Sequence, residues 1–197
     1  MVQLLERGYS VRACVRDADS PKADFLRAMP QCVTGRLTVH SADINVPGVF
    51  DAIFAGCHGV VHSADQLMSS GGENEEKGHT ASAHPDAALG AIGSIISSIQ
   101  KSGGTVARLV YTSSIAAVLH ESDMQQFLKR PVIHDRRYPG EQFTSEEYKA
   151  NVSANGYAIA KIRVEAAVTE AAAASSGMWD ALIANPVGAM RVSCGSL

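Results

Sequence analysis

The segment NGYAIAKIRVE, residues 155–165, places Tyr157 and Lys161 four positions apart. In a helix, residues at this spacing share one face, so the ammonium group can lie beside the phenol. A nearby cation favours the ionised form of a phenol. Such a pair can give a proton to a carbonyl oxygen while a cofactor supplies a hydride. The same spacing also fits a solvated helix face, so the pair alone leaves both interpretations open.

A second segment that can do chemistry is the run TSS at residues 112–114, which follows the apolar strand pattern RLVY. A fixed hydroxyl such as that of Ser114 can stabilise charge that develops on a carbonyl oxygen. The run also fits an ordinary turn after a strand. Elsewhere, His79 and His84 lack carboxylate or thiolate neighbours in HTASAH, and we therefore predict no metal site.

Helix and strand patterns alternate around these residues. Periodicity and capping residues predict helices over residues 2–8, 20–29, 47–56, 86–103 and 155–176. They predict strands over residues 9–17, 36–44, 59–64, 107–114 and 179–186. Short apolar strands that alternate with helices are typical of a parallel sheet buried on both faces. We therefore predict an α/β fold with a Rossmann-like doubly wound parallel sheet, in a single domain over residues 1–197.

Each predicted strand ends in polar or small residues, and ligands bind at this edge of such sheets. The strand ends carry Arg16, Asp43, His62–Ala64, Thr112–Ser114 and Asn185–Val187. Arg16 precedes Asp17, so a surface ion pair is the alternative to a ligand contact. We interpret His62 as a packing residue rather than a catalyst.

The composition restricts the class of protein. The net charge of −3 and the sequence pI of about 6.1 provide no basic field for nucleic acid. The apolar runs are much shorter than the roughly 20 residues that cross a membrane. Four scattered cysteines without a CxxC pair predict reduced thiols, and we expect a cytoplasmic protein.

Several segments, taken in order, resemble the extended short-chain dehydrogenase/reductase superfamily, and in particular proteins like dihydroflavonol reductase and cinnamoyl-CoA reductase. They are LLERGYSVRACVRD, ADI, GCHGVVHSA, RLVYTSSIAAV, YAIAK followed by Glu165, and WDALIANP. The resemblance spans nearly the whole chain. It implies an NADP-dependent oxidoreductase, with NAD possible, that reduces a small aldehyde or ketone to an alcohol. The oligomeric state stays open.

The resemblance also implies individual roles. Tyr157 would be the general acid, Lys161 would hold the nicotinamide ribose, and Ser114 would hydrogen-bond the substrate carbonyl. Arg16 would meet the adenosine 2′-phosphate, which favours NADPH over NADH. The other cofactor-binding positions would be Asp43 and Ile44 beside the adenine, Ser63 and Ala64 near the pyrophosphate, Thr112, and Pro186 and Val187 beside the nicotinamide.

The sequence departs from the family pattern at both ends. The family opens with a strand and a GxxGxxG turn that approaches the pyrophosphate, whereas this sequence starts within the following helix. The strands and the small substrate region expected after NPVGAMRV are also missing. We therefore predict a fragment or an incomplete gene model, which can be inactive as it stands. The alternatives are an NAD-dependent sugar-nucleotide epimerase or dehydratase and a non-catalytic dinucleotide-binding remnant.

Overall fold

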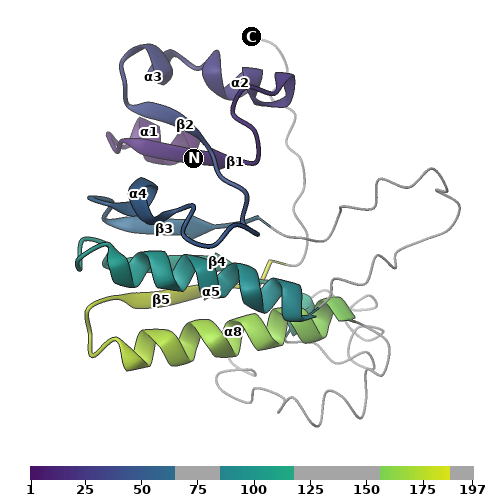
Figure 1. Ribbon diagram of the computed structural model, residues 1–197. Coiled ribbons are helices and arrows are strands. Elements are labelled where there is room, and N and C mark those ends of the chain that lie inside the picture. Colours follow the sequence, from purple (N-terminus) through teal and green to yellow (C-terminus); the bar gives the residue numbers. More distant parts are fainter. Residues whose placement is uncertain (65–84, 118–155, 187–197) are drawn as a thin grey trace, which may run out of the picture. The chain divides into compact units, whose positions relative to one another are not determined.

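The computed structural model describes residues 1–64, 85–117 and 156–186 (Figure 1). The chain divides into two compact units, one from residues 1–58 and 93–106, the other from residues 59–92 and 107–197. Helix α5 (Pro85–Lys101) contributes to both units. Each unit has its own parallel sheet.

The first unit contains a two-stranded parallel sheet of β1 (Val11–Val15) and β2 (Leu37–Ser41). The helices of this unit are short, apart from the part of α5 that belongs to it. They are α1 (Val2–Glu6), η1 (Pro21–Ala23), α2 (Asp24–Arg27), α3 (Pro30–Val33) and α4 (Asp51–Phe54). After α1 the chain turns at Gly8, whose φ of 92° is tolerated because glycine lacks a Cβ.

Polar side chains hold helix α4 in place within the first unit. The Arg12 guanidinium donates hydrogen bonds to the Ile53 and Ala55 carbonyls, at 2.5 and 2.8 Å, and so satisfies the end of the helix. At the other end, Asp51 accepts hydrogen bonds from Ser98 and Lys101 of α5, at 2.5 and 2.8 Å. These bonds connect α4 to a neighbouring strand and to α5.

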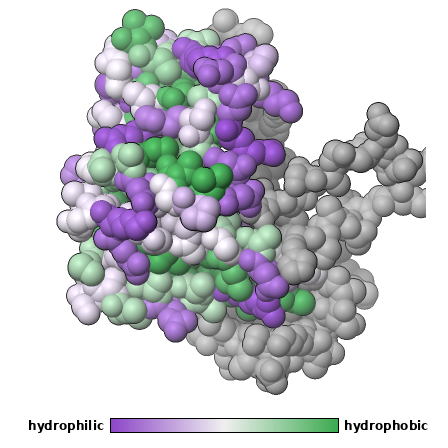
Figure 2. All heavy atoms as spheres, in the orientation of Figure 1, coloured by the Kyte–Doolittle hydropathy of each residue, from purple (hydrophilic) through white to green (hydrophobic). Residues whose placement is uncertain are grey.

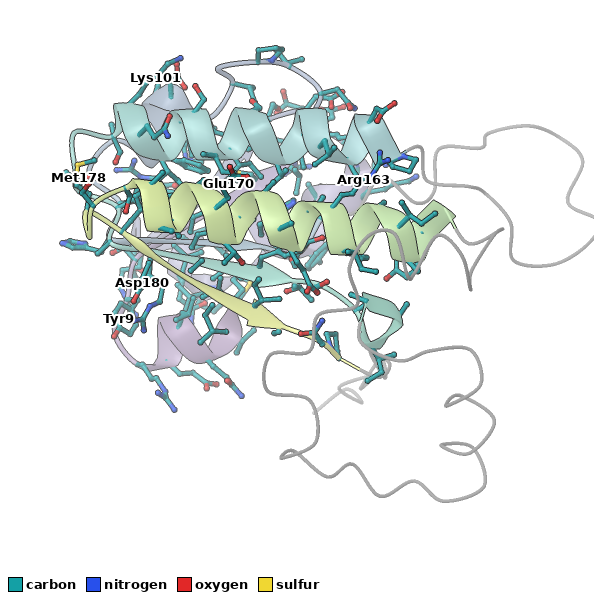
Figure 3. All side chains as sticks on the ribbon, turned by 90° about the horizontal axis from the view of Figure 1, so that it is seen from below. Tyr9, Lys101, Arg163, Glu170, Met178 and Asp180 are labelled. Atoms are coloured by element: carbon teal, nitrogen blue, oxygen red, sulfur yellow. The ribbon has the colours of Figure 1, made fainter. Side chains whose placement is uncertain are left out.

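The second unit contains a three-stranded parallel sheet in the order β3 (Gly59–His62), β4 (Arg108–Thr112) and β5 (Asp180–Ala184). The short helix η2 (Ile115–Ala117) follows β4. The long helix α8 (Gly156–Ala174) precedes β5 and runs alongside the strands (Figure 3). Beyond α8 the chain turns at Ser176 and Gly177, with φ values of 54° and 83°, and enters β5.

The two faces of this sheet differ in burial. Val60, Leu109 and Tyr111 are at most 8% exposed, as expected for the face that packs into the core. On the other face, Val61, Val110 and Leu182 are adjacent in the strand register. Val61 is 60% exposed and Leu182 is 48% exposed. The expectation that the strands are buried on both faces is therefore wrong for β3 and β5.

The strand neighbours agree with the predicted doubly wound sheet. The pairs β2–β1, β3–β4 and β4–β5 are all parallel, as expected for that sheet. Two short helices were not predicted, namely α3, which starts at Pro30, and η2 after the TSS run. Cys14, Cys32 and Cys57 are free thiols.

Hydrophilic and hydrophobic residues are interspersed on the face of the molecule that Figure 2 shows. No helix among the residues described by the structure is both long and apolar enough to cross a membrane.

Candidate active site

One face of helix α8 carries Tyr157, Lys161 and Glu165 at successive intervals of four residues. Lys161 is only 5% exposed and Glu165 only 8% exposed, whereas Tyr157 is half-buried. Charged side chains are rarely buried without partners, because the loss of hydration is costly. Lys161 and Glu165 must therefore have interaction partners, and these partners show which residues form the site.

Lys161 contacts the end of strand β4. Its Nζ atom donates a hydrogen bond to the Thr112 carbonyl at 3.2 Å. The same Nζ lies 5.1 Å from the ring centroid of Tyr111 and 5.6 Å from that of Tyr157, within the range of cation–π contacts. The ammonium group is thus held between the strand end and the phenol one turn earlier in the helix.

The turn that carries Ser114 is tied to the end of strand β5. The Ser113 N–H donates to the Ala184 carbonyl at 2.8 Å, and the Ile115 N–H donates to the Pro186 carbonyl at 3.1 Å. The Ser114 hydroxyl oxygen accepts the Ala116 N–H at 3.2 Å, which leaves the hydroxyl proton for donation. Ser114 is 9% exposed, so its position is set by these bonds rather than by solvent.

Small residues allow the Ser114 turn to pack against helix α8. Ala158 directly follows Tyr157 and is fully buried. Ala116 of η2 packs against it, together with Ile159 and Ile162. The elements that carry Ser114 and Tyr157 are therefore in direct contact.

Two residues without a predicted role complete this network. The Asn185 Nδ2 atom donates to Glu165 Oε1 at 2.7 Å and to the Ser114 carbonyl at 3.0 Å. Both residues lie in segments that carry the family resemblance, YAIAK with Glu165 and WDALIANP. Their pairing across 20 positions depends on the fold, and the sequence alone contains no signal for it.

The first unit contains Arg16, Asp43 and Ile44, each just after a strand. Arg16 is exposed, and none of the ion pairs among the described residues joins it to Asp17. The Asp17 carboxylate instead accepts the Asp19 N–H at 2.9 Å. The alternative of an Arg16–Asp17 surface pair is therefore wrong.

Asp43 is also held by a local turn. Its Oδ1 accepts the backbone N–H and the side-chain Nδ2 of Asn45, both at 2.9 Å. Asp43 and Ile44 are half-buried. This geometry fixes the direction of the Asp43 carboxylate at the end of β2.

The remaining predicted positions follow β3 and β5. Ser63 and Ala64 are exposed immediately after β3. His62 is 8% exposed and stacks on Tyr111 at a centroid distance of 5.6 Å, which agrees with its interpretation as a packing residue. Pro186 is exposed and accepts the hydrogen bond from Ile115.

Some predictions lie outside the described residues. They concern Val187 of the cofactor set, and His79 and His84 of the rejected metal site. Within the part of the chain that the structure describes, no three metal-ligating side chains form a cluster.

The structure thus brings Ser114, Thr112, Tyr157 and Lys161 together in the second unit. A proton donor, a buried cation and a fixed hydroxyl suit the reduction of a polarised carbonyl group. The residues predicted to meet the adenosine part of a cofactor lie in the first unit.

Comparisons with known proteins show what the chain is similar to. No family model matches the chain. The chain is 36% identical over 176 residues to a dihydroflavonol 4-reductase of Callistephus chinensis, covering 87% of the chain and 43% of that protein. It is 30% identical over 184 residues to cinnamoyl-CoA reductase 2 of Medicago truncatula, covering 93% of the chain and 48% of that protein.

Among solved structures, yeast methylglyoxal/isovaleraldehyde reductase Gre2 in complex with NADPH shares the fold, with a TM-score of 0.63 and 22% identity. The match covers 94% of this chain and 53% of that one. The chain is therefore similar in sequence to dihydroflavonol 4-reductases and cinnamoyl-CoA reductases, and it shares its fold with the Gre2 reductase.

The chain spans about half the length of the curated relatives it matches. The predictions that the sequence is a fragment and that residues 1–197 form one domain stay predictions.

Proposed function

We propose that the protein is an NADP-dependent oxidoreductase that reduces an aldehyde or ketone to an alcohol. The observation that supports this proposal most strongly is the position of Lys161. Its buried ammonium group lies 5.6 Å from the Tyr157 ring centroid and is bonded to the strand end that leads into Ser114. A solvated helix face would not place this ammonium group in the interior.

In the proposed reaction, bound NADPH supplies the hydride. Tyr157 donates its hydroxyl proton to the carbonyl oxygen as the hydride arrives at the carbon. Lys161 stabilises the phenolate that remains, because its charge is close and shielded from water. The Ser114 hydroxyl donates a hydrogen bond to the same carbonyl oxygen, keeps its proton and stabilises the developing negative charge.

The proposed cofactor contacts are assigned residue by residue. Arg16 offers an exposed guanidinium group without an ion-pair partner in the described chain, which suits the 2′-phosphate of NADP. Asp43 and Ile44 would lie by the adenine, Ser63 and Ala64 by the pyrophosphate, and Thr112, Lys161, Pro186 and Val187 by the nicotinamide and its ribose. The NADPH in the complex of the structurally similar Gre2 supports NADP as the cofactor.

The proposed function is tested by NADPH oxidation with a panel of aldehydes and ketones, with each product identified by mass. We expect alcohol formation with at least one aldehyde or ketone and a preference for NADPH over NADH. Epimerisation of a sugar nucleotide with bound NAD and no net oxidation of NADPH would instead support the epimerase alternative. Tight NADPH binding without turnover of any carbonyl would support a non-catalytic dinucleotide-binding protein.

A further inference from the structure

The side chain of Asn185 bridges the segments that carry the proposed catalytic residues. One N–H of its amide points to Glu165 on helix α8, and the other points to the carbonyl of Ser114. Glu165 lies one turn after Lys161 and two turns after Tyr157 on the same helix face. A single amide group therefore connects the Tyr157 and Lys161 helix to the Ser114 turn.

The orientation of this amide is determined by its partners. A carboxylate and a backbone carbonyl both accept hydrogen bonds, so only the nitrogen of the amide can face them. Rotation of the amide by half a turn would place its oxygen against two other oxygens. Glu165 is 8% exposed, and a buried carboxylate bonded to a donor at 2.7 Å is a strong restraint.

The Ser114 carbonyl accepts the Ala117 N–H within its own turn, at 3.0 Å, and the Asn185 side chain adds a bond to it from the segment after β5. Pro186 follows Asn185 and has no N–H group to donate to the turn after β4. The backbone still links Ser113 to Ala184 and Ile115 to Pro186 on either side of Ser114. The Asn185 amide supplies a second donor to the Ser114 carbonyl between these two bonds.

We propose that Asn185 and Glu165 are positioning residues that fix the position of the Ser114 turn relative to helix α8. Glu165 fixes the Asn185 amide, and the amide fixes the Ser114 carbonyl and hence the direction of the Ser114 hydroxyl. The inference rests on the proposed function, because it states that these hydrogen bonds align Ser114 with Tyr157 for catalysis. Misplacement of a catalytic group by about 1 Å can lower a rate about 100-fold.

The first arm of the test is kinetic and uses Asn185→Ala, Glu165→Ala, Glu165→Gln and the double variant Asn185→Ala/Glu165→Ala. We expect Asn185→Ala and Glu165→Ala each to lower kcat about 10-fold to 100-fold, with the NADPH Kd changed less than about threefold. The double variant should be no worse than either single variant, because both remove one network. Glu165→Gln should stay close to wild type, since its amide oxygen still accepts from Asn185.

The matched control is Glu170→Ala, which removes an exposed carboxylate from the same helix (Figure 3). We expect it to leave kcat and the NADPH Kd unchanged. An equal loss in Glu165→Gln and Glu165→Ala, or multiplicative losses in the double variant, would overturn the proposal. So would an unchanged kcat in Asn185→Ala.

The second arm does not depend on turnover. Hydrogen exchange of the Ile115, Ala116 and Ala117 amides measures how firmly the Ser114 turn is held. We expect exchange of these amides to be faster in Asn185→Ala and Glu165→Ala, but not in Glu165→Gln or Glu170→Ala. Unchanged exchange in Asn185→Ala would overturn the positioning role. Wild-type protein without turnover would refute the proposed function, while the exchange data would still decide whether the turn is held by Asn185.

Discussion

The polar residues proposed to act in the two units are held in different ways. In the second unit, Lys161 and Glu165 are buried and bonded to Thr112 and Asn185. In the first unit, Arg16 is exposed, and no ion pair of the described chain includes it. A proton donor must be aligned before the reaction begins, so its supports are built into the fold. A group that binds a phosphate can be ordered by the ligand itself.

The largest expected effect on activity comes from removing the buried charge of Lys161, which tests this difference between the two units. Lys161→Met keeps a long side chain but removes the ammonium group that lies between Thr112 and Tyr157. We expect kcat/KM to fall about 100-fold or more, as for the loss of a preorganised electrostatic group. Lys22→Met, which removes an exposed ammonium group in the first unit, should leave kcat/KM unchanged. Steady-state kinetics with NADPH would contradict the account if both variants behaved alike.

Two adjacent serines sharpen the comparison within the second unit. The Ser114 hydroxyl accepts the Ala116 N–H, whereas the buried Ser113 hydroxyl has no hydrogen-bond partner among the described residues. We expect Ser114→Ala to lower kcat about 100-fold through the loss of a donor to the carbonyl oxygen. Ser113→Ala should leave kcat unchanged and should not lower the free energy of unfolding, because it removes an unsatisfied buried group.

Kinetics and chemical denaturation of both serine variants give the two readouts. A greater loss of kcat in Ser113→Ala than in Ser114→Ala would show that the wrong serine has been assigned.

A substitution in the first unit should have a smaller effect, and this effect should be confined to the binding of NADPH. Arg16→Ala removes the guanidinium group proposed to meet the 2′-phosphate. We expect the Kd of NADPH to rise about 10-fold, because a hydrogen bond to a charged group contributes about 1.5–3 kcal/mol. The Kd of NADH should change less than about twofold. Fluorescence titration with both cofactors measures this, and Arg7→Ala, another exposed arginine of the first unit, is the control.

Equal weakening of NADPH and NADH binding in Arg16→Ala would contradict a contact with the 2′-phosphate.

The smallest expected effect concerns ion pairs away from the site. Hydrogen bonds from Arg108 hold the pKa of Asp180 below its ordinary value of 3.8. Bonds from Lys101, and then Ser98, do the same for the pKa of Asp51 in the first unit. A carboxyl group with a lowered folded-state pKa stabilises the fold above its unfolded pKa. That contribution disappears as the pH falls through the folded value.

We therefore expect Asp180→Asn to be slightly less stable than wild type at neutral pH, with a gap that closes below about pH 4. Asp51→Asn should show the same sign in the first unit. Unfolding by urea across a pH series measures both gaps. A gap that stays constant down to acid pH would contradict the assigned cause of the pKa shifts.

The sequence was sufficient for the main features of the fold because the long elements have clear signals. Helix α8 was expected over residues 155–176 and runs over Gly156–Ala174. Short elements such as α3 and η2 were missed, because a single turn of helix has too few residues to show a period. The exposure of Val61 and Leu182 was missed because burial of a strand face depends on what packs against it.

Part of the candidate site was predictable because it depends on the local geometry of one long helix. The spacing of Tyr157 and Lys161 places both on one helix face, and this follows from local geometry. The burial of Lys161 against Thr112 depends on how closely α8 approaches β4, which no local pattern encodes. The pairing of Glu165 with Asn185 depends on the packing of α8 against β5, so the sequence contained both residues without indicating their contact.

The central claim is that Tyr157 is the proton donor in a hydride-transfer reaction and is supported by Lys161. The most direct test is single-turnover oxidation of NADPH by the best carbonyl substrate, in wild-type protein, Tyr157→Phe and the exposed control Tyr9→Phe. We predict that Tyr157→Phe lowers the rate about 100-fold to 10,000-fold with an unchanged NADPH Kd. Tyr9→Phe should match wild type. A Tyr157→Phe rate equal to that of wild type would contradict the account.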